Sequence, residues 1–341
     1  MILGGRIIFT TRIRSVGRYL SRHENTILAF VIVALVAGFG VASKGSTLLR
    51  ENVINILLQS SVRGIASIGQ AFVILTAGID VSVAGVGLLC SIVGAGLMTA
   101  NAEQAIIGQP ITIYGAIPIV LLLAAALGAV NGMSVSRLGM PPLIVTLAVW
   151  QITYGLGFWI SEGNAIDGLP DNLGILGGTI GTSGVIPVPV VLFIVVSAGA
   201  YCILQYTQFG RHIYAVGGNP SSAWLSGINV RNVLLSAYVI SGFLTGLASV
   251  VFTARVMAAS MQTLLRLEMD TIAAVTIGGV SLAGGRGNII GVVLGVLVVG
   301  ILNNGMFVLG RGLAERTILT GVVMLCAVGI DYMRRGERSI D

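Results

Sequence analysis

A carboxylate and a hydroxyl stand two residues apart in an otherwise uncharged part of the chain. Asp80 interrupts a run with no other Asp, Glu, Lys or Arg from residue 64 to residue 102, and Ser82 follows it. An ionisable side chain at membrane depth is costly and by default suggests a solute or ion pathway. The alternative is that Asp80 caps the next helix by accepting backbone N–H groups. The sequence leaves both roles open.

Four side-chain amides also lie well inside apolar runs. They could hydrogen-bond a polyhydroxylated solute or a neighbouring helix, and the sequence favours neither role. The four are Gln70, Asn131, Asn303 and Asn304. Together with Asp80 and Ser82, they form the candidate solute pathway.

A second polar block combines two acids with a glycine-rich turn. Glu268 and Asp270 stand where a helix is expected to begin, and acidic side chains there complement the helix dipole. Gly284, Gly285 and Gly287 follow and suit a tight turn between two spans. We interpret this acidic and glycine block as structural.

No catalytic, metal-binding or cofactor-binding motif stands out. The nearest approach to a phosphate loop, residues 40–47, places Lys44 before Gly45 instead of after it. The two histidines, His23 and His212, flank apolar runs and belong to no Ser/His/Asp set. The sequence therefore predicts a protein that is not an enzyme and binds no cofactor or metal itself.

The composition shows where these groups must be placed. Hydrophobic residues make up 55% of the 341 residues and charged residues 9%, against roughly 25% charged in an average soluble domain. This excludes an ordinary cytosolic enzyme. Since a helix needs about 20 apolar residues to cross a bilayer, the uncharged runs predict about ten spans. We expect an all-α polytopic protein with one transmembrane domain over residues 26–333.

The basic residues predict the orientation of the spans. The net charge of +6 could suggest nucleic acid, but the arginines stand at the ends of apolar runs. Threading ten spans places twelve Lys/Arg on one side and six on the other, and the richer side should be cytoplasmic. The basic segment 1–25 and the tail 334–341 then both lie in the cytoplasm. A cleaved signal peptide is the competing interpretation, but the first apolar run is long and no small-x-small site follows it.

Two connections are too long to be simple turns. Residues 161–187 are rich in Gly, Pro, Asn and Asp and should form a loop outside. Residues 208–231 should lie inside, with a short helix that has Asn219 as N-cap, Pro220 as its first residue and Gly227 as its stop. Such a helix suits docking of a soluble partner.

Small residues predict close packing of the spans. The 48 glycines include the pairs Gly242-x-x-x-Gly246 and Gly291-x-x-x-Gly295, a spacing that lets membrane helices approach closely. Cys90, Cys202 and Cys326 lie in apolar stretches without metal-ligand spacing, so we expect them to have packing roles.

Three blocks taken together resemble one family. They are Gly78-Ile-Asp80-Val-Ser82, Ala215-Val-Gly217-Gly218-Asn219 with Leu225-Ser226-Gly227-Ile228, and Leu267-Glu268-Met-Asp270 running to Gly284-Gly285-Arg286-Gly287. In this order, over residues 52–331, the chain resembles the permease subunit of ribose-type ABC sugar importers, the second class of carbohydrate uptake transporters. Ala84 and Met269 depart from the usual pattern of that family.

The resemblance implies a fold, a location and partners. The fold would be a permease bundle like that of the vitamin B12 importer, in the bacterial inner membrane. The permease would pair with a second permease, as a homodimer or heterodimer. It would dock a cytoplasmic ABC ATPase that uses ATP, and a periplasmic sugar-binding protein would feed it.

The resemblance also implies roles for particular residues. The ATPase-coupling helix and its approach would comprise Gly217, Gly218, Asn219, Ala223, Leu225, Ser226 and Gly227. The solute pathway would lie at the permease interface, with Asp80 and Ser82 near its wall. The solute would be a pentose such as ribose, a hexose, a polyol or autoinducer-2. An ion-coupled secondary carrier is the alternative function, and a scaffold or membrane enzyme is a third.

Overall fold

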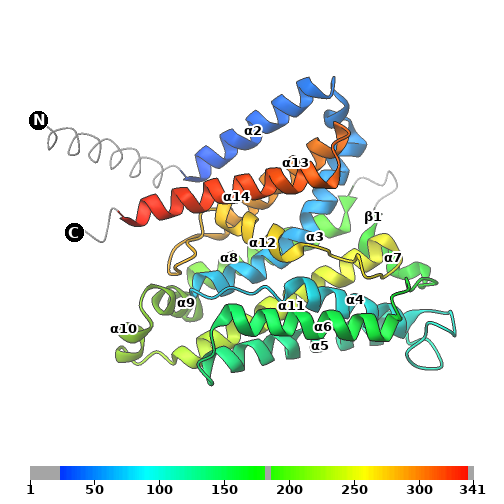
Figure 1. Ribbon diagram of the computed structural model, residues 1–341, viewed down its shortest axis with the longest axis horizontal. Coiled ribbons are helices and arrows are strands. Elements are labelled where there is room, and N and C mark those ends of the chain that lie inside the picture. Colours follow the sequence, from blue (N-terminus) through cyan, green and yellow to red (C-terminus); the bar gives the residue numbers. More distant parts are fainter. Residues whose placement is uncertain (1–23, 181–185, 337–341) are drawn as a thin grey trace, which may run out of the picture.

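Helices form nearly all the regular structure of the computed structural model, which describes residues 24–180 and 186–336. The long helices run roughly along the longest axis of the molecule (Figure 1). In the described residues, the strands β1 (Thr179–Ile180) and β2 (Ile186–Pro187) form one short antiparallel pair. The predicted helical architecture is confirmed for this part of the chain. The basic segment 1–25 lies outside it except for its last two residues, and so do the last five residues of the tail.

Six of the described helices are long and apolar enough to cross a membrane. They are α2 (Glu24–Ala42), α5 (Ile113–Ser136), α6 (Pro142–Ser161), α8 (Val188–Tyr206), α11 (Val230–Val256) and α13 (Ile289–Val308). Their lengths match the roughly 20 residues that a bilayer requires. The chain is therefore a polytopic membrane protein.

Four further helices occupy the remaining predicted spans but differ from a simple apolar helix. α3 (Arg50–Leu75) and α14 (Leu313–Gly336) are long and carry charges, whereas α4 (Val83–Met98) and α12 (Leu267–Ile277) are short, with 16 and 11 residues. The expected total of ten spans stays a prediction.

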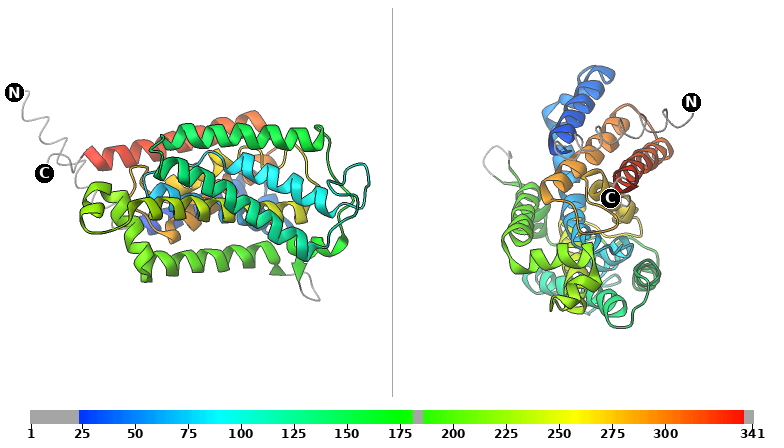
Figure 2. Two further views of the ribbon diagram at one scale, coloured as in Figure 1. Left: turned by 90° about the horizontal axis from the view of Figure 1, so that it is seen from below. Right: turned by 90° about the vertical axis from the view of Figure 1, so that its left-hand side faces the viewer.

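The two predicted long connections lie at opposite ends of the molecule. Residues 208–231 contain α9 (Gln208–Gly218) and α10 (Pro220–Leu225). The start of α2 and the end of α14 lie at the same end of the molecule (Figures 1 and 2). Residues 161–187 contain the 3-10 turn η2 (Asp171–Leu173), α7 (Gly174–Gly177) and the strands, at the other end, where η1 (Ser46–Leu48) also lies. This arrangement matches an even number of crossings.

The centre of the bundle is formed by α3 and α11, and glycines set the distance of their neighbours. A Cβ on Gly242 of α11 would collide with the Ala124 carbonyl oxygen and lie 3.0 Å from the Cα of Gly128, both on α5. A Cβ on Gly291 or Gly295 of α13 would likewise collide with backbone of α12 and of the residue that follows it. Both predicted small-residue contacts are confirmed.

The cysteines follow the predicted packing role only in part. Cys90 is fully buried on α4. Cys202 and Cys326 are exposed on the surface of the chain, so they do not have the predicted packing role within this chain. An apolar stretch in a membrane protein can face lipid as readily as protein, and the sequence pattern did not separate the two cases.

We expect Gly242→Ala to lower the stability of the bundle because its methyl group must push α11 away from α5. Overpacking of this kind costs about 1–3 kcal/mol. The matched control is Gly155→Ala on α6, where a Cβ would meet nothing within 4 Å. The midpoint of thermal unfolding in detergent should fall for the first variant and not for the second. Equal midpoints would show that α5 and α11 are not in backbone contact.

Candidate functional site

The predicted short helix is present as α10, and its caps are those that the sequence indicates. The Asn219 side chain accepts a hydrogen bond from the Ser222 N–H at 3.0 Å, and Pro220 is the first helical residue. The helix ends where Gly227 adopts a φ of +82° and the Ile228 N–H donates to the Ala223 carbonyl at 3.1 Å. These local bonds fix the helix at both ends, as predicted.

One face of α10 holds it to the protein and the other is open. Ala223 is buried, whereas Trp224 is 69% exposed and Leu225 is 78% exposed. Beside them lies an open groove of about 840 Å³ between α10 and the start of α11, with Ile228 and Arg231 in its lining. An exposed aromatic and an exposed leucine next to a groove are typical of a surface that docks another protein.

The helix before α10 is joined to the transmembrane core by direct backbone contact. A Cβ on Gly217, in the last turn of α9, would collide with the carbonyl oxygen of Leu75 at the end of α3. That same carbonyl accepts a hydrogen bond of 2.8 Å from the Gly285 N–H. Tyr214 of α9 donates its hydroxyl to the Gly287 carbonyl at 3.0 Å. The end of α9, the end of α3 and the turn between α12 and α13 therefore meet at one point, which we call the glycine junction.

The glycines of the third block are needed at this junction. Gly284 and Gly285 have φ values of +79° and +69°. A Cβ on Gly284 would lie 2.7 Å from the Ala77 nitrogen, and a Cβ on Gly285 would lie 2.7 Å from Gly218. Only glycine combines this conformation with such close approach.

The turn between α3 and α4 is built around Asp80, which is 1% exposed. Its Oδ1 accepts the Ser82 N–H at 3.0 Å and the Ser82 hydroxyl at 2.6 Å. Its Oδ2 accepts the Ser241 hydroxyl of α11 at 2.8 Å. The carboxylate thus directs α4 into the bundle and ties its start to α11.

Two of the four candidate amides belong to this same cluster. The Gln70 amide, with its nitrogen toward the Asp80 carbonyl, donates to that oxygen at 3.0 Å and accepts from the Asp80 N–H at 3.2 Å. Asn131 of α5 donates to the Ser82 hydroxyl at 2.8 Å. Both amides are fully buried. The Asp80 cluster of Gln70, Asp80, Ser82, Asn131 and Ser241 thus joins four helices.

The other two candidate amides lie elsewhere on α13. Asn304 exchanges two hydrogen bonds of 2.9 and 3.0 Å with the Asn52 amide of α3. Asn303 donates to the Val299 carbonyl within its own helix at 3.1 Å. The structure therefore divides the six predicted pathway residues into two groups.

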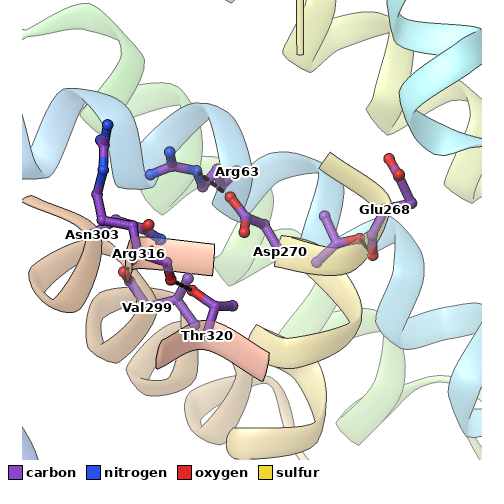
Figure 3. Close-up of polar contacts among 8 residues, drawn as sticks. Arg63, Glu268, Asp270, Val299, Asn303, Arg316 and Thr320 are labelled. Carbon is purple, nitrogen blue, oxygen red and sulfur yellow. Dashed lines mark hydrogen bonds and ion pairs between the residues drawn. The ribbon is translucent and has the colours of Figure 1, made fainter. Parts of the chain in front are cut away.

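The acidic block contributes an ion pair inside the bundle. Asp270, in the first turn of α12, accepts a charge-assisted bond of 2.9 Å from Arg63 Nε of α3. Figure 3 shows these two side chains pointing toward one another, while Glu268 of the same turn points away. The sequence predicted only that Asp270 interacts favourably with the helix dipole. The structure shows that it also forms an ion pair with Arg63.

Comparison with known proteins places the chain in a family. Residues 52–328 match the family described as "Branched-chain amino acid transport system / permease component". The chain is 35% identical over 319 residues to the ribose import permease protein of Haemophilus influenzae, which covers 93% of this chain and 94% of the relative. The chain belongs to the ribose-type permeases of ABC sugar importers. As a permease it is a sugar-transport membrane protein.

Other relatives of this permease differ in their solutes. It is 37% identical over 280 residues to the ribose import permease protein of Bacillus subtilis, covering 82% of this chain and 84% of the relative. It is 36% identical over 308 residues to the D-allose transport system permease protein of Escherichia coli K12, with coverage of 89% and 90%. No solved structure matches the permease at a significant level.

Several residues that complete these sites were missed by sequence reasoning. Ser241, Tyr214 and Asn52 are ordinary polar residues, and nothing in their local sequence distinguishes them from helix-facing side chains. Arg63 could have been recognised from the sequence, because it is the one charged residue in α3 after the first turn of that helix. A charge at that depth calls for a partner.

We expect Gly217→Ala in this permease to open the glycine junction. The new methyl group would collide with the Leu75 carbonyl, so the bond from the Gly285 N–H to that oxygen should break. Hydrogen–deuterium exchange of the segment around Gly285 should then become faster. Gly218→Ala is the matched control, because a Cβ on Gly218 would meet nothing within 4 Å. Unchanged exchange in the first variant would contradict the contact.

Proposed function

We propose that this permease moves a sugar or sugar-like solute from the periplasm to the cytoplasm, driven by ATP hydrolysis on a separate subunit. The candidate solutes are a pentose such as ribose, a hexose, a polyol or autoinducer-2. The permease would pair with a second permease in a bundle like that of the vitamin B12 importer, in the bacterial inner membrane. A periplasmic sugar-binding protein would deliver the solute.

The observation that carries this proposal is the link from the exposed face of α10 to the core. Trp224 and Leu225 offer a docking surface, and α9 brings that surface to the glycine junction, where Gly217 contacts Leu75. A soluble ATPase that moved α10 would therefore act on the ends of α3 and α12 without a flexible loop between them. Close-packed elements transmit such displacements because they cannot deform continuously.

The proposed orientation is supported by the twelve Lys/Arg that the threading of the sequence places on the α10 side, against six on the other. Among the twelve, Arg137 follows α5, Arg211 lies in α9 and Arg231 lies in the first turn of α11. Lys and Arg concentrate in short loops on the cytoplasmic side. We therefore propose that α10 lies in the cytoplasm, where an ATPase can reach it, and that residues 161–187 lie in the periplasm.

The Asp80 cluster fits a positioning role in this mechanism. All hydrogen bonds of the Asp80 carboxylate in the described structure come from Ser82 and Ser241, and Gln70 and Asn131 hold the same turn. In an apolar surrounding, such bonds are retained because unpaired polar groups are expensive. We propose that the cluster keeps α3, α4, α5 and α11 in register while α9 transmits motion to α3.

The proposal is tested by uptake of radiolabelled D-ribose into proteoliposomes that contain the permease with its ATPase and binding protein. Uptake should require ATP and should continue when the proton gradient is dissipated. The alternative, an ion-coupled carrier that uses Asp80, predicts the opposite response to both conditions. Uptake that persists without ATP and the ATPase would refute the ABC mechanism.

A charge on the exposed face of α10 should uncouple the two proteins. We expect Leu225→Asp to lower ATP-dependent uptake by about tenfold or more, since loss of a central apolar contact commonly costs 2 kcal/mol or more. The protein should still reach the membrane because Leu225 is 78% exposed. The control is Leu138→Asp, the same change at a 74% exposed position between α5 and α6, outside the groove. Normal uptake by the Leu225 variant would exclude α10 as the docking helix.

A further inference from the structure

A second cavity lies in the half of the bundle away from α10. It has a volume of about 510 Å³ and is bordered by α3, the last turn of α11, residues 262–265 and the first turn of α12. Pockets that bind small molecules typically measure about 300–1,000 Å³. Its polar and aromatic lining consists of Gln59, Arg63, Phe252, Arg255, Gln262 and Asp270. This solute cavity, as we call it, contains none of the residues of the Asp80 cluster.

The polar groups of the solute cavity are incompletely used by the protein. Arg63 gives its Nε–H to Asp270, but its Nη1 is buried and has no partner among the described residues. The side chains of Gln59, which is half-buried, and Gln262, which is exposed, make no hydrogen bond within the described residues and are free to contact a ligand. A buried donor without a partner is costly and requires an explanation. A polar ligand in the cavity would supply the missing bonds.

The chemistry of the lining selects one class of ligand. A guanidinium offers only donors and a carboxylate only acceptors, while an amide offers both. A hydroxyl can meet each of these, because it donates and accepts. Phe252 and Leu264 supply apolar wall for the C–H faces of a ring. The Asp270 charge balances that of Arg63 at 2.9 Å, and Arg255, which also lines the cavity, adds further donors that hydroxyl oxygens can accept from.

The simpler explanation is that Arg63 and Asp270 only tie α3 to α12. Figure 3 shows the pair between these helices, and Asp270 holds the start of α12 by this bond. A purely structural pair, however, does not account for the cavity that adjoins it. It also leaves Arg63 Nη1 unexplained.

We propose that the solute cavity is a binding site for a polyhydroxylated solute, an aldose or polyol, on its way through the permease. Arg63 and Asp270 contact adjacent hydroxyl groups, and Gln59 and Gln262 contact those further along the ring. The inference rests on the proposed transport function and assigns that function to particular side chains. It replaces the Asp80 cluster as the place where the solute is held.

The test is ATP-dependent uptake of radiolabelled D-ribose into the same proteoliposomes, with the binding protein at saturating concentration. Gln59→Leu removes a contact outside the ion pair, and Arg63→Lys keeps the charge but loses the planar fork. We expect uptake to fall by about tenfold or more in each, as for sites that recognise a hydroxyl by hydrogen bonds. The thermal stability of the Gln59 variant should stay at the wild-type level, because the Gln59 side chain makes no hydrogen bond within the described residues.

The matched control is Gln205→Leu, the same change at an exposed position of α8 that does not line the cavity. Wild-type uptake in the Gln59 and Arg63 variants would overturn the site while leaving the transport function intact. Uptake restored by the exchange Arg63→Asp with Asp270→Arg would show that the pair is only structural, and this too would overturn the site. No ATP-dependent uptake by the wild-type protein of any of the proposed solutes, whether pentose, hexose, polyol or autoinducer-2, would refute the transport function itself.

Discussion

The structure depends on one contact in which backbone meets backbone without side chains between them. At the glycine junction, Gly217 lies against the Leu75 carbonyl, and that oxygen accepts the Gly285 N–H at 2.8 Å. A side chain at Gly217 would separate α9 from α3 by at least the width of a methyl group. Helices in lipid gain little from burying apolar surface against one another, so close approach and hydrogen bonds decide how they associate. The junction provides both, between a surface segment and the core.

This constraint explains why three separate parts of the sequence carry the unusual residues. The end of α3, the end of α9 and the turn after α12 each bring backbone to the junction, so each needs small residues or a left-handed turn. Ala77 has a φ of +63°, and its nitrogen is close to Gly284. The same turn leads directly to Asp80, whose carboxylate then fixes α4. In apolar surroundings a broken helix requires internal partners for its freed polar groups, and the Asp80 cluster supplies them.

The sequence predicted those features that depend on neighbouring residues. Asn219, Pro220 and Gly227 define α10 because capping is a local interaction, and the glycine spacing on α11 and α13 marked the close contacts correctly. Features that depend on residues far apart in the chain were not predictable in this way. The pairing of Arg63 with Asp270 joins α3 to α12, and the sequence around either residue does not indicate that the other is its partner. Likewise, α9 was expected only as part of a loop, because its role appears once its last turn meets α3.

The two functional regions are linked by one helix. α3 carries Gln59 and Arg63 at the solute cavity, Gln70 at the Asp80 cluster and Leu75 at the glycine junction. From Gly64 to Leu75 every residue of this helix is buried. A buried helix moves as a unit because its packed side chains cannot yield independently. A displacement imposed at Leu75 must therefore reach Arg63.

Since Asp270 is bonded to Arg63 and the turn after α12 is bonded to Leu75, α12 is held by α3 at both ends. In the proposed mechanism, motion that enters at the junction would thus reach Arg63 and Asp270, the two side chains that face the solute cavity together, and this would couple an ATPase bound at α10 to the proposed solute site.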